Sequence, residues 1–124
     1  MQKSANILIV DDCVEFASST ATLLSSVGHH VATSLDAKSC AELVKSEQFD
    51  VIIMDINMYD VDGRELAREL ESTHDLQNTA IIYASTRRAL LNANIVGSED
   101  NYLIKPFTKE QLFGAIDTAM KIGV

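Results

Sequence analysis

Four charged residues of this chain stand at the ends of short apolar runs. They are Asp11, Asp12, Asp55 and Lys105. The runs before them are Ile7–Val10, Val51–Met54 and Tyr102–Ile104, which we interpret as strands of a parallel sheet. Ligands of open parallel sheets bind just beyond the carboxyl ends of the strands. The sequence therefore predicts that three carboxylates and one ammonium converge at one edge of a sheet.

This combination of charges suits metal-assisted phosphoryl chemistry. Carboxylates that share a site repel one another, and one pKa rises unless a cation joins them. Mg²⁺ takes oxygen ligands, usually one or two carboxylates together with waters and a phosphate. Asp55 would be the nucleophile, because a carboxylate can form an aspartyl-phosphate. Lys105 would hold a phosphoryl oxygen or pair with Asp55, whereas Asp11 and Asp12 taken alone would be a loop and a helix N-cap.

Two further residues stand beside this group. Ser85 ends the run Ile81–Ala84, and its hydroxyl can bond a phosphoryl oxygen, although by itself it would be a helix cap. Pro106, the single proline of the chain, follows Lys105. Because an X-Pro bond in a tight turn can be cis, we expect Pro106 to fix the direction in which Lys105 points.

Strand-like and helix-like patterns alternate along the chain. We expect strands at Ile7–Val10, His30–Leu35, Val51–Met54, Ala80–Ala84 and around Leu103 and Ile104. We expect helices at Val14–Val27, Ala37–Gln48, Arg64–Ser72, about Ala89–Val96 and Lys109–Ile122. Gly28 is the predicted C-cap of the first helix, and Asp36 is the predicted N-cap of the second. Thr108 and Gln111 form a capping-box pattern before the last helix.

Strict alternation of this kind predicts an α/β fold in which right-handed crossovers place helices on both faces of a parallel sheet. The second strand, His30–Leu35, is more polar than the others and so indicates an edge. A strand order of 2-1-3-4-5 puts it there and sets strands one and three side by side at the switch point. No linker or internal repeat interrupts the pattern. We therefore expect one domain over residues 1–124, a doubly wound five-stranded parallel sheet of the flavodoxin-like type.

The composition argues against several classes of protein. The chain has 124 residues, 10 basic and 18 acidic, and a net charge of −8, which opposes direct binding to nucleic acid or to an anionic membrane. No apolar run approaches the ~20 residues of a membrane span, and the N-terminus runs into a strand without a signal peptide. Cys13 and Cys40 fit no metal or redox spacing. We therefore expect a reduced, cytoplasmic protein.

In order and spacing, the motifs resemble those of receiver domains of response regulators in two-component signalling, including single-domain chemotaxis regulators. The resemblance runs from about Ile7 to Ile122. Its motifs are Ile9-Val10-Asp11-Asp12, Met54-Asp55-Ile56-Asn57-Met58, Asp62-Gly63, Ser85 and Tyr102-Leu103-Ile104-Lys105-Pro106-Phe107. Each motif is weak alone, but together they are highly specific.

The resemblance implies a role for each matching residue. Asp55 would accept a phosphoryl group from the phosphohistidine of a partner histidine kinase or phosphotransfer protein. Mg²⁺ would be held by Asp11 or Asp12, by Asp55 and by the backbone carbonyl of Asn57.

The resemblance also implies a switch. Ser85 and Lys105 would contact the phosphoryl group, and Tyr102 would swing inward when Ser85 moves. A downstream protein would then sense the face made by the fourth helix, the fifth strand and the fifth helix. The domain would speed the transfer of phosphate onto and off its own aspartate, with no independent substrate turnover.

Three positions depart from the family pattern. Tyr59 stands where the family usually has proline, Thr86 stands where a small residue is usual, and Arg87 occupies a position that tunes phosphoryl lifetime. We expect Thr86 to restrict access to the acceptor and Arg87 to stabilise the phosphorylated form. Ser85 and Lys105 are only 20 positions apart, which predicts a short, weak fourth helix.

Two other classes of function stay open. A degenerate receiver would act as a phosphorylation-independent binding module, which Tyr59, Thr86 and the short fourth helix favour slightly. A flavin carrier is disfavoured because the first turn has no glycine- or hydroxyl-rich phosphate cradle, and a phosphatase is disfavoured because Asn57 stands where a second acid is needed. The last helix lacks an obvious set of cross-pairing charges, so we expect a monomer rather than a dimer.

Overall fold

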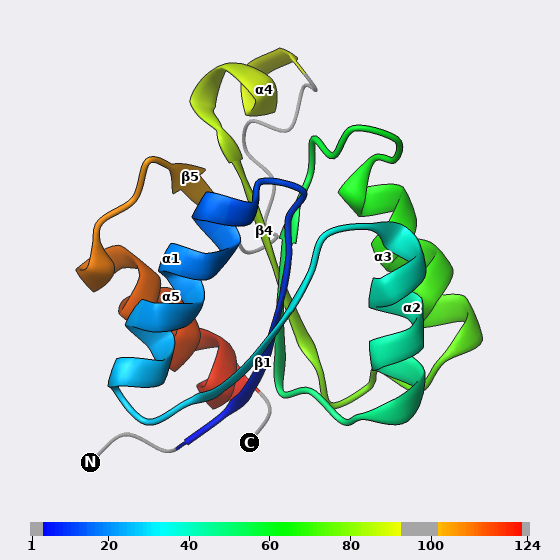
Figure 1. Ribbon diagram of the computed structural model, residues 1–124, viewed down its shortest axis with the longest axis horizontal. Coiled ribbons are helices and arrows are strands. Elements are labelled where there is room, and N and C mark those ends of the chain that lie inside the picture. The colour runs from blue at the N-terminus through cyan, green and yellow to red at the C-terminus, as the bar shows by residue number, and fades with distance from the viewer. Residues whose placement is uncertain (1–3, 93–101, 123–124) are drawn as a thin grey trace.

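The computed structural model describes residues 4–92 and 102–122, and in it strands and helices alternate strictly (Figure 1). The strands are β1 (Asn6–Val10), β2 (His30–Ser34), β3 (Val51–Asp55), β4 (Ala80–Thr86) and β5 (Tyr102–Lys105). The helices are α1 (Val14–Ser26), α2 (Ala37–Ser46), α3 (Gly63–Thr73), α4 (Arg87–Asn92) and α5 (Lys109–Ile122). Within the described ranges, no helix combines the length and the apolar character that crossing a membrane would need.

The five strands form one parallel sheet in the order β2-β1-β3-β4-β5, which confirms the predicted fold class and strand order. In the register of this sheet, Val10 lies beside Met54 and Asp55 lies beside Ala84. The carboxyl ends of β1, β3 and β4 are therefore level with one another. Residues that end these three strands, or directly follow them, meet at one edge of the sheet.

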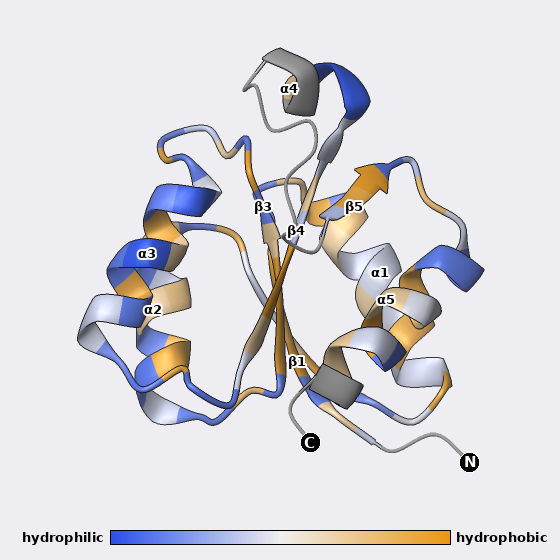
Figure 2. Ribbon diagram, turned by 180° about the vertical axis from the view of Figure 1, so that it is seen from behind, coloured by the Kyte–Doolittle hydropathy of each residue, from blue (hydrophilic) through white to orange (hydrophobic). Residues whose placement is uncertain are grey.

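Alternate residues of the central strands pack on opposite faces of the sheet. Ile9 and Ile53 belong to a core cluster that α1 and α5 cover, whereas Leu8 and Ile52 belong to a second cluster covered by α2 and α3. Figure 1 shows α1 with α5 on one side of the sheet and α2 with α3 on the other, and Figure 2 shows the apolar strands between these layers. Burial on both faces explains why β1 and β3 are continuous apolar runs rather than alternating ones.

Two of the three predicted helix caps are confirmed, and the third is displaced by one residue. The Asp36 side chain accepts a hydrogen bond from the Ser39 backbone N–H at 2.8 Å. Before α5, the Thr108 hydroxyl oxygen accepts from the Gln111 N–H at 3.0 Å, and the Gln111 side chain accepts from the Thr108 N–H at 2.9 Å. These reciprocal bonds are a capping box. After α1, the C-cap is Val27, one residue before the predicted position, and Gly28 follows with a φ of 97° that glycine adopts without strain.

Three boundaries differ by two residues from the predicted ones: α2 ends at Ser46 and not Gln48, β4 ends at Thr86 and not Ala84, and α4 begins at Arg87 and not Ala89. The reason at α4 is Thr86, whose hydroxyl oxygen accepts a hydrogen bond from the Ala89 N–H at 3.1 Å and so starts the helix early. The predicted extension of this helix to Val96 lies outside the described residues.

Candidate functional site

Three carboxylates meet at the carboxyl end of the sheet. Asp11 follows β1 and Asp55 ends β3, and these two strands are neighbours. One carboxylate oxygen from each of Asp11, Asp12 and Asp55 lies within 4.8 Å of the others. Asp11 and Asp55 are buried, with 1% and 6% of their surface exposed, whereas Asp12 is exposed. The structure therefore brings together the three acidic side chains that the strand ends predicted.

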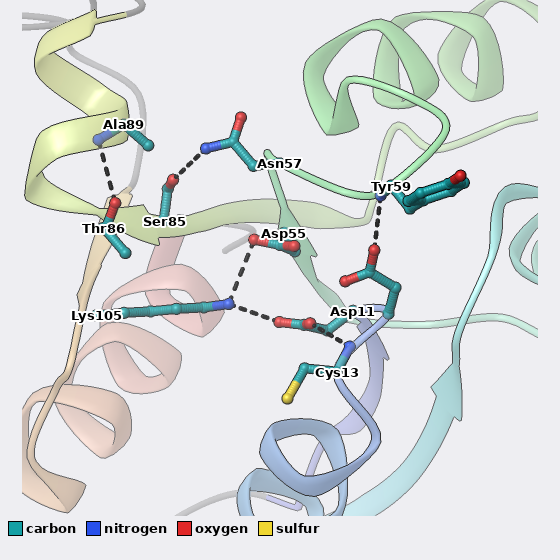
Figure 3. A network of polar contacts seen from close by, with 10 residues as sticks. Asp11, Cys13, Asp55, Asn57, Tyr59, Ser85, Thr86, Ala89 and Lys105 are labelled. Atoms are coloured by element: carbon teal, nitrogen blue, oxygen red, sulfur yellow. Dashed lines mark hydrogen bonds and ion pairs between the residues drawn. The ribbon is translucent and has the colours of Figure 1, made fainter.

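The Lys105 ammonium reaches this cluster from the end of β5. Its Nζ donates to Asp11 Oδ2 at 2.7 Å and to Asp55 Oδ1 at 3.3 Å (Figure 3). The peptide bond between Lys105 and Pro106 is cis. Within the described cluster, this ammonium is bonded to two of three carboxylates, so the cluster itself carries more negative than positive charge. Such a site attracts a cation or a protonated group.

Burial and the neighbouring charges shift the pKa values of Asp55 and Lys105. Burial raises the pKa of Asp55, the Lys105 charge opposes that shift only in part, and the Asp11 charge adds to it. Burial by itself would lower the pKa of Lys105. The hydrogen bond to Asp11 and the charge of Asp55 outweigh burial, so the Lys105 pKa lies above its ordinary value. Lys105 is thus held as a cation, while Asp55 gives up its proton less readily than a solvated aspartate.

Ser85 lies next to the cluster at the end of β4 and is almost fully buried. The Asn57 side-chain amide donates a hydrogen bond to the Ser85 hydroxyl oxygen at 3.2 Å (Figure 3). A hydroxyl that accepts in this way keeps its own proton for another acceptor. The sequence predicted a role only for the Asn57 backbone carbonyl, and no sequence signal would have found this side-chain contact.

Tyr102 packs against a second tyrosine. The rings of Tyr83 and Tyr102 are 5.6 Å apart, centroid to centroid, at an interplanar angle of 32°, and both pack against Ile56. Tyr83 was missed by the sequence analysis. The sheet register pairs Tyr83 with Tyr102 directly, so an alignment of β4 with β5 would have been the signal. Both side chains are half-buried, which leaves Tyr102 between core and solvent.

Tyr59 contacts the acidic pair through its backbone and not through its ring. Its N–H donates to Asp12 Oδ2 at 2.6 Å, while its side chain is 97% exposed. Proline, which is usual in receivers at this position, has no N–H. The departure at Tyr59 therefore adds a hydrogen bond between the loop after β3 and Asp12.

Gly63 allows the same loop to pass close to the end of β3. A Cβ at this position would overlap the carbonyl oxygen of Asp55 and lie 2.9 Å from Met54 Cγ. The Gly63 N–H donates to the Ile56 carbonyl at 2.8 Å. Asp62 accepts from the Arg64 N–H at 2.8 Å and thereby caps α3. The Asp62-Gly63 motif thus turns the chain into α3 directly behind Asp55.

The two other predicted tuning residues lie at the start of α4. Thr86 and Arg87 are both exposed, and the Thr86 hydroxyl is used to cap α4. Their predicted effects on access and phosphoryl lifetime stay predictions.

Residues 7–117 match the family model described as the response regulator receiver domain. The chain belongs to this family. It is 32% identical over 113 residues to protein PilG of Pseudomonas aeruginosa, an alignment that covers 89% of this chain and 83% of PilG. It is 30% identical over 115 residues to response regulator MprA of Mycolicibacterium vanbaalenii, covering 93% of this chain but only 50% of MprA.

The fold comparison agrees with the sequence comparison. The chemotaxis response regulator CheY4 of Vibrio cholerae superposes with a TM-score of 0.80 at 26% identity, covering 94% of this chain and 99% of that one. The chain therefore has the fold of a known response regulator, and the resemblance drawn from the motifs is confirmed.

Changing Tyr59 to proline tests the contact with Asp12. Tyr59→Pro removes the N–H, so the Asp12 carboxylate is freed for a metal ion, and we expect Mg²⁺ to bind roughly fivefold more tightly, the size of a modest hydrogen bond to a charged group. Calorimetric titration measures the dissociation constant. Tyr59→Ala is the matched control, because it deletes the exposed ring and keeps the N–H. Equal affinities for the two variants would contradict the prediction.

Changing Gly63 to alanine tests the close approach to Asp55. The added methyl group must displace backbone atoms, so Gly63→Ala should lower the free energy of unfolding by about 1–3 kcal/mol. Urea denaturation gives this value. Gly114→Ala is the control, because a Cβ there meets nothing within 4 Å and alanine favours the helix by about 0.5–1 kcal/mol. The prediction fails if both variants shift stability in the same direction.

Changing Asp55 to asparagine tests the burial of its charge. The pKa of Asp55 is higher in the folded protein than in the unfolded chain, so the folded state loses stability as the pH rises through the interval between those two values. Without divalent ions, Asp55→Asn should therefore be more stable than the wild type at neutral pH, and its advantage should shrink as the pH falls below the raised pKa. Thermal unfolding at several pH values measures this. An advantage that does not change with pH would contradict the assigned cause.

Proposed function

We propose that this receiver is a phosphorylation-driven signalling switch whose phosphoacceptor is Asp55. The observation that carries the proposal is the convergence of Asp11, Asp12 and Asp55 with the Lys105 ammonium at one end of the sheet. Response-regulator receivers interact with histidine kinases and phosphotransfer proteins, and the donor for this chain is the phosphohistidine of such a partner. The whole chain, residues 1–124, acts as a single receiver domain.

The donor set fits a magnesium ion. Mg²⁺ binds carboxylate and carbonyl oxygens, and an excess of buried negative charge is the environment in which it relieves repulsion. The residues that would hold it are Asp11 or Asp12, Asp55 and the backbone carbonyl of Asn57. When bound, the ion neutralises carboxylate charge and offsets that of the incoming phosphoryl group.

The transfer itself needs little beyond positioning. A carboxylate oxygen of Asp55 attacks phosphorus while the bond between phosphorus and the donor histidine nitrogen breaks, and that nitrogen keeps the electron pair. Lys105 turns its ammonium from Asp55 to a phosphoryl oxygen. The Ser85 hydroxyl, which accepts from Asn57 and keeps its proton, donates to a second phosphoryl oxygen.

The new contacts carry the signal outward. Phosphorylation adds charge and strong acceptor oxygens, so Ser85 and Lys105 are drawn toward Asp55, from the ends of β4 and β5. Tyr102, half-buried against Tyr83, then moves inward. A downstream protein senses the face made by α4, β5 and α5, and Arg87 at the start of α4 prolongs the phosphorylated state by charge pairing.

Several general properties belong to the proposal. The domain acts in the cytoplasm as a monomer, and it turns over only its own phosphoryl group. Its net charge of −8 favours a protein target over nucleic acid or an anionic membrane.

A binding module without phosphorylation is the second candidate. It is favoured because both acids already accept hydrogen bonds within the protein. The Lys105 ammonium donates to Asp11, and the Tyr59 N–H donates to Asp12. In that case the site would be a structural ion-pair network, and a partner would recognise the unphosphorylated surface.

Intact-mass spectrometry separates the two candidates. With Mg²⁺ and acetyl phosphate, the wild type should gain one phosphoryl group, and Asp55→Asn, which lacks the nucleophile, should gain none. Chelating the metal should abolish the gain. A folded wild type that neither gains mass nor binds the phosphoryl mimic beryllofluoride would favour the binding module.

A further inference from the structure

The Lys105 ammonium lies over the face of an aromatic ring. Its Nζ is 4.1 Å from the centroid of Phe16, a half-buried residue of the first turn of α1. At this distance the negative face of the ring attracts a cation. The ammonium is thus surrounded by two kinds of partner, the carboxylates of Asp11 and Asp55 and one uncharged aromatic face.

A second ring holds Phe16 in this orientation. Phe107, two residues after Lys105, packs edge-to-face on Phe16, with centroids 5.6 Å apart and an interplanar angle of 81°. Edge-to-face pairs of this kind are favourable beyond the area they bury. Phe107 also packs against the core cluster under α1 and α5. The turn that carries Lys105 therefore also carries the ring that fixes the partner of Lys105.

The two kinds of partner behave differently when a divalent cation enters. The cation competes with Lys105 for the oxygens of Asp11 and Asp55, and its charge repels the ammonium. The Phe16 ring does not compete, because it has no oxygen to offer the metal and keeps its attraction for the ammonium. Without this ring, a long flexible lysine released by the carboxylates would gain entropy by turning into solvent.

We propose that Phe16 is a positioning residue for Lys105, which keeps the ammonium at the acceptor site after a divalent cation has taken the carboxylates. This inference rests on the proposed function, because it assigns Phe16 a role in binding the phosphoryl group through Lys105. It concerns the residue beneath the lysine, and it holds whichever protein donates the phosphoryl group.

Removing the ring should weaken the binding of beryllofluoride without weakening the binding of Mg²⁺ alone. In Phe16→Leu, Lys105 opposes the metal less, so Mg²⁺ alone binds as tightly as in the wild type or more tightly. Beryllofluoride at saturating Mg²⁺ binds roughly five- to tenfold more weakly, which is the range of a partly buried cation–π contact. Phe16→Tyr keeps the aromatic face and should restore wild-type affinity for beryllofluoride.

Two further variants make the test specific. Phe113→Leu removes a ring from α5 that packs against the same core cluster, and it should leave both affinities unchanged. Phe16→Leu introduced into a Lys105→Met background should have no additional effect on beryllofluoride affinity, since the double-mutant cycle isolates the contact between the two side chains. Circular dichroism checks that each variant is folded, and ¹⁹F NMR of bound beryllofluoride with calorimetry of Mg²⁺ gives the dissociation constants.

Each outcome has one meaning. A weaker beryllofluoride complex in Phe16→Leu, with Mg²⁺ affinity retained and with rescue by tyrosine, supports the positioning role. Unchanged beryllofluoride affinity in Phe16→Leu overturns it, as does a parallel loss of both affinities that tyrosine does not restore. Failure of the wild type itself to bind beryllofluoride is a different result, because it contradicts the proposed function and not the role of Phe16 alone.

Discussion

Two buried carboxylates, Asp11 and Asp55, lie beside each other, and both accept hydrogen bonds from the Lys105 ammonium. The repulsion between the two carboxylates is the interaction that the rest of the site must compensate. Lys105 offsets part of that repulsion through hydrogen bonds of 2.7 Å and 3.3 Å, and Asp12 adds a further charge at the rim of the cluster. Burial raises the pKa of Asp55, the charge of Lys105 opposes that shift in part, and the charge of Asp11 adds to it. A site with this excess of negative charge gains from binding a metal ion. The excess negative charge therefore suits a cation, as the proposed phosphoryl transfer requires.

The parallel sheet holds these charged residues close together. Its apolar strands, packed on both faces by helices, bring the ends of β1, β3, β4 and β5 to one edge of the sheet. The loops then complete the site from the outside. The loop after β3 brings the Tyr59 N–H to Asp12 and turns sharply at Gly63, and the turn after β5 brings Phe107 against Phe16. The strands therefore set where the charges lie, and the loops set what each charge contacts.

The sequence predicts the strand order, the layers and the meeting of Asp11, Asp55 and Lys105, because continuous apolar runs and strand ends are local signals that the sheet repeats faithfully. It does not predict the Asn57 contact with Ser85, the pairing of Tyr83 with Tyr102 or the ring of Phe16 beneath Lys105. These contacts depend on side-chain directions between segments far apart in the chain, which periodicity does not encode. The same limit explains Tyr59, whose departure from proline is visible in the sequence although the hydrogen bond that it allows is not.

The identity of the acceptor is the central claim, and reductive trapping tests it most directly. Borohydride reduces an aspartyl-phosphate to homoserine, so after incubation with Mg²⁺ and acetyl phosphate the reduced residue can be located by peptide mass spectrometry. We predict homoserine at position 55 alone, and none when the metal is chelated. Homoserine at a different aspartate, or none in a folded protein whose intact mass shows a phosphoryl group, would contradict the account.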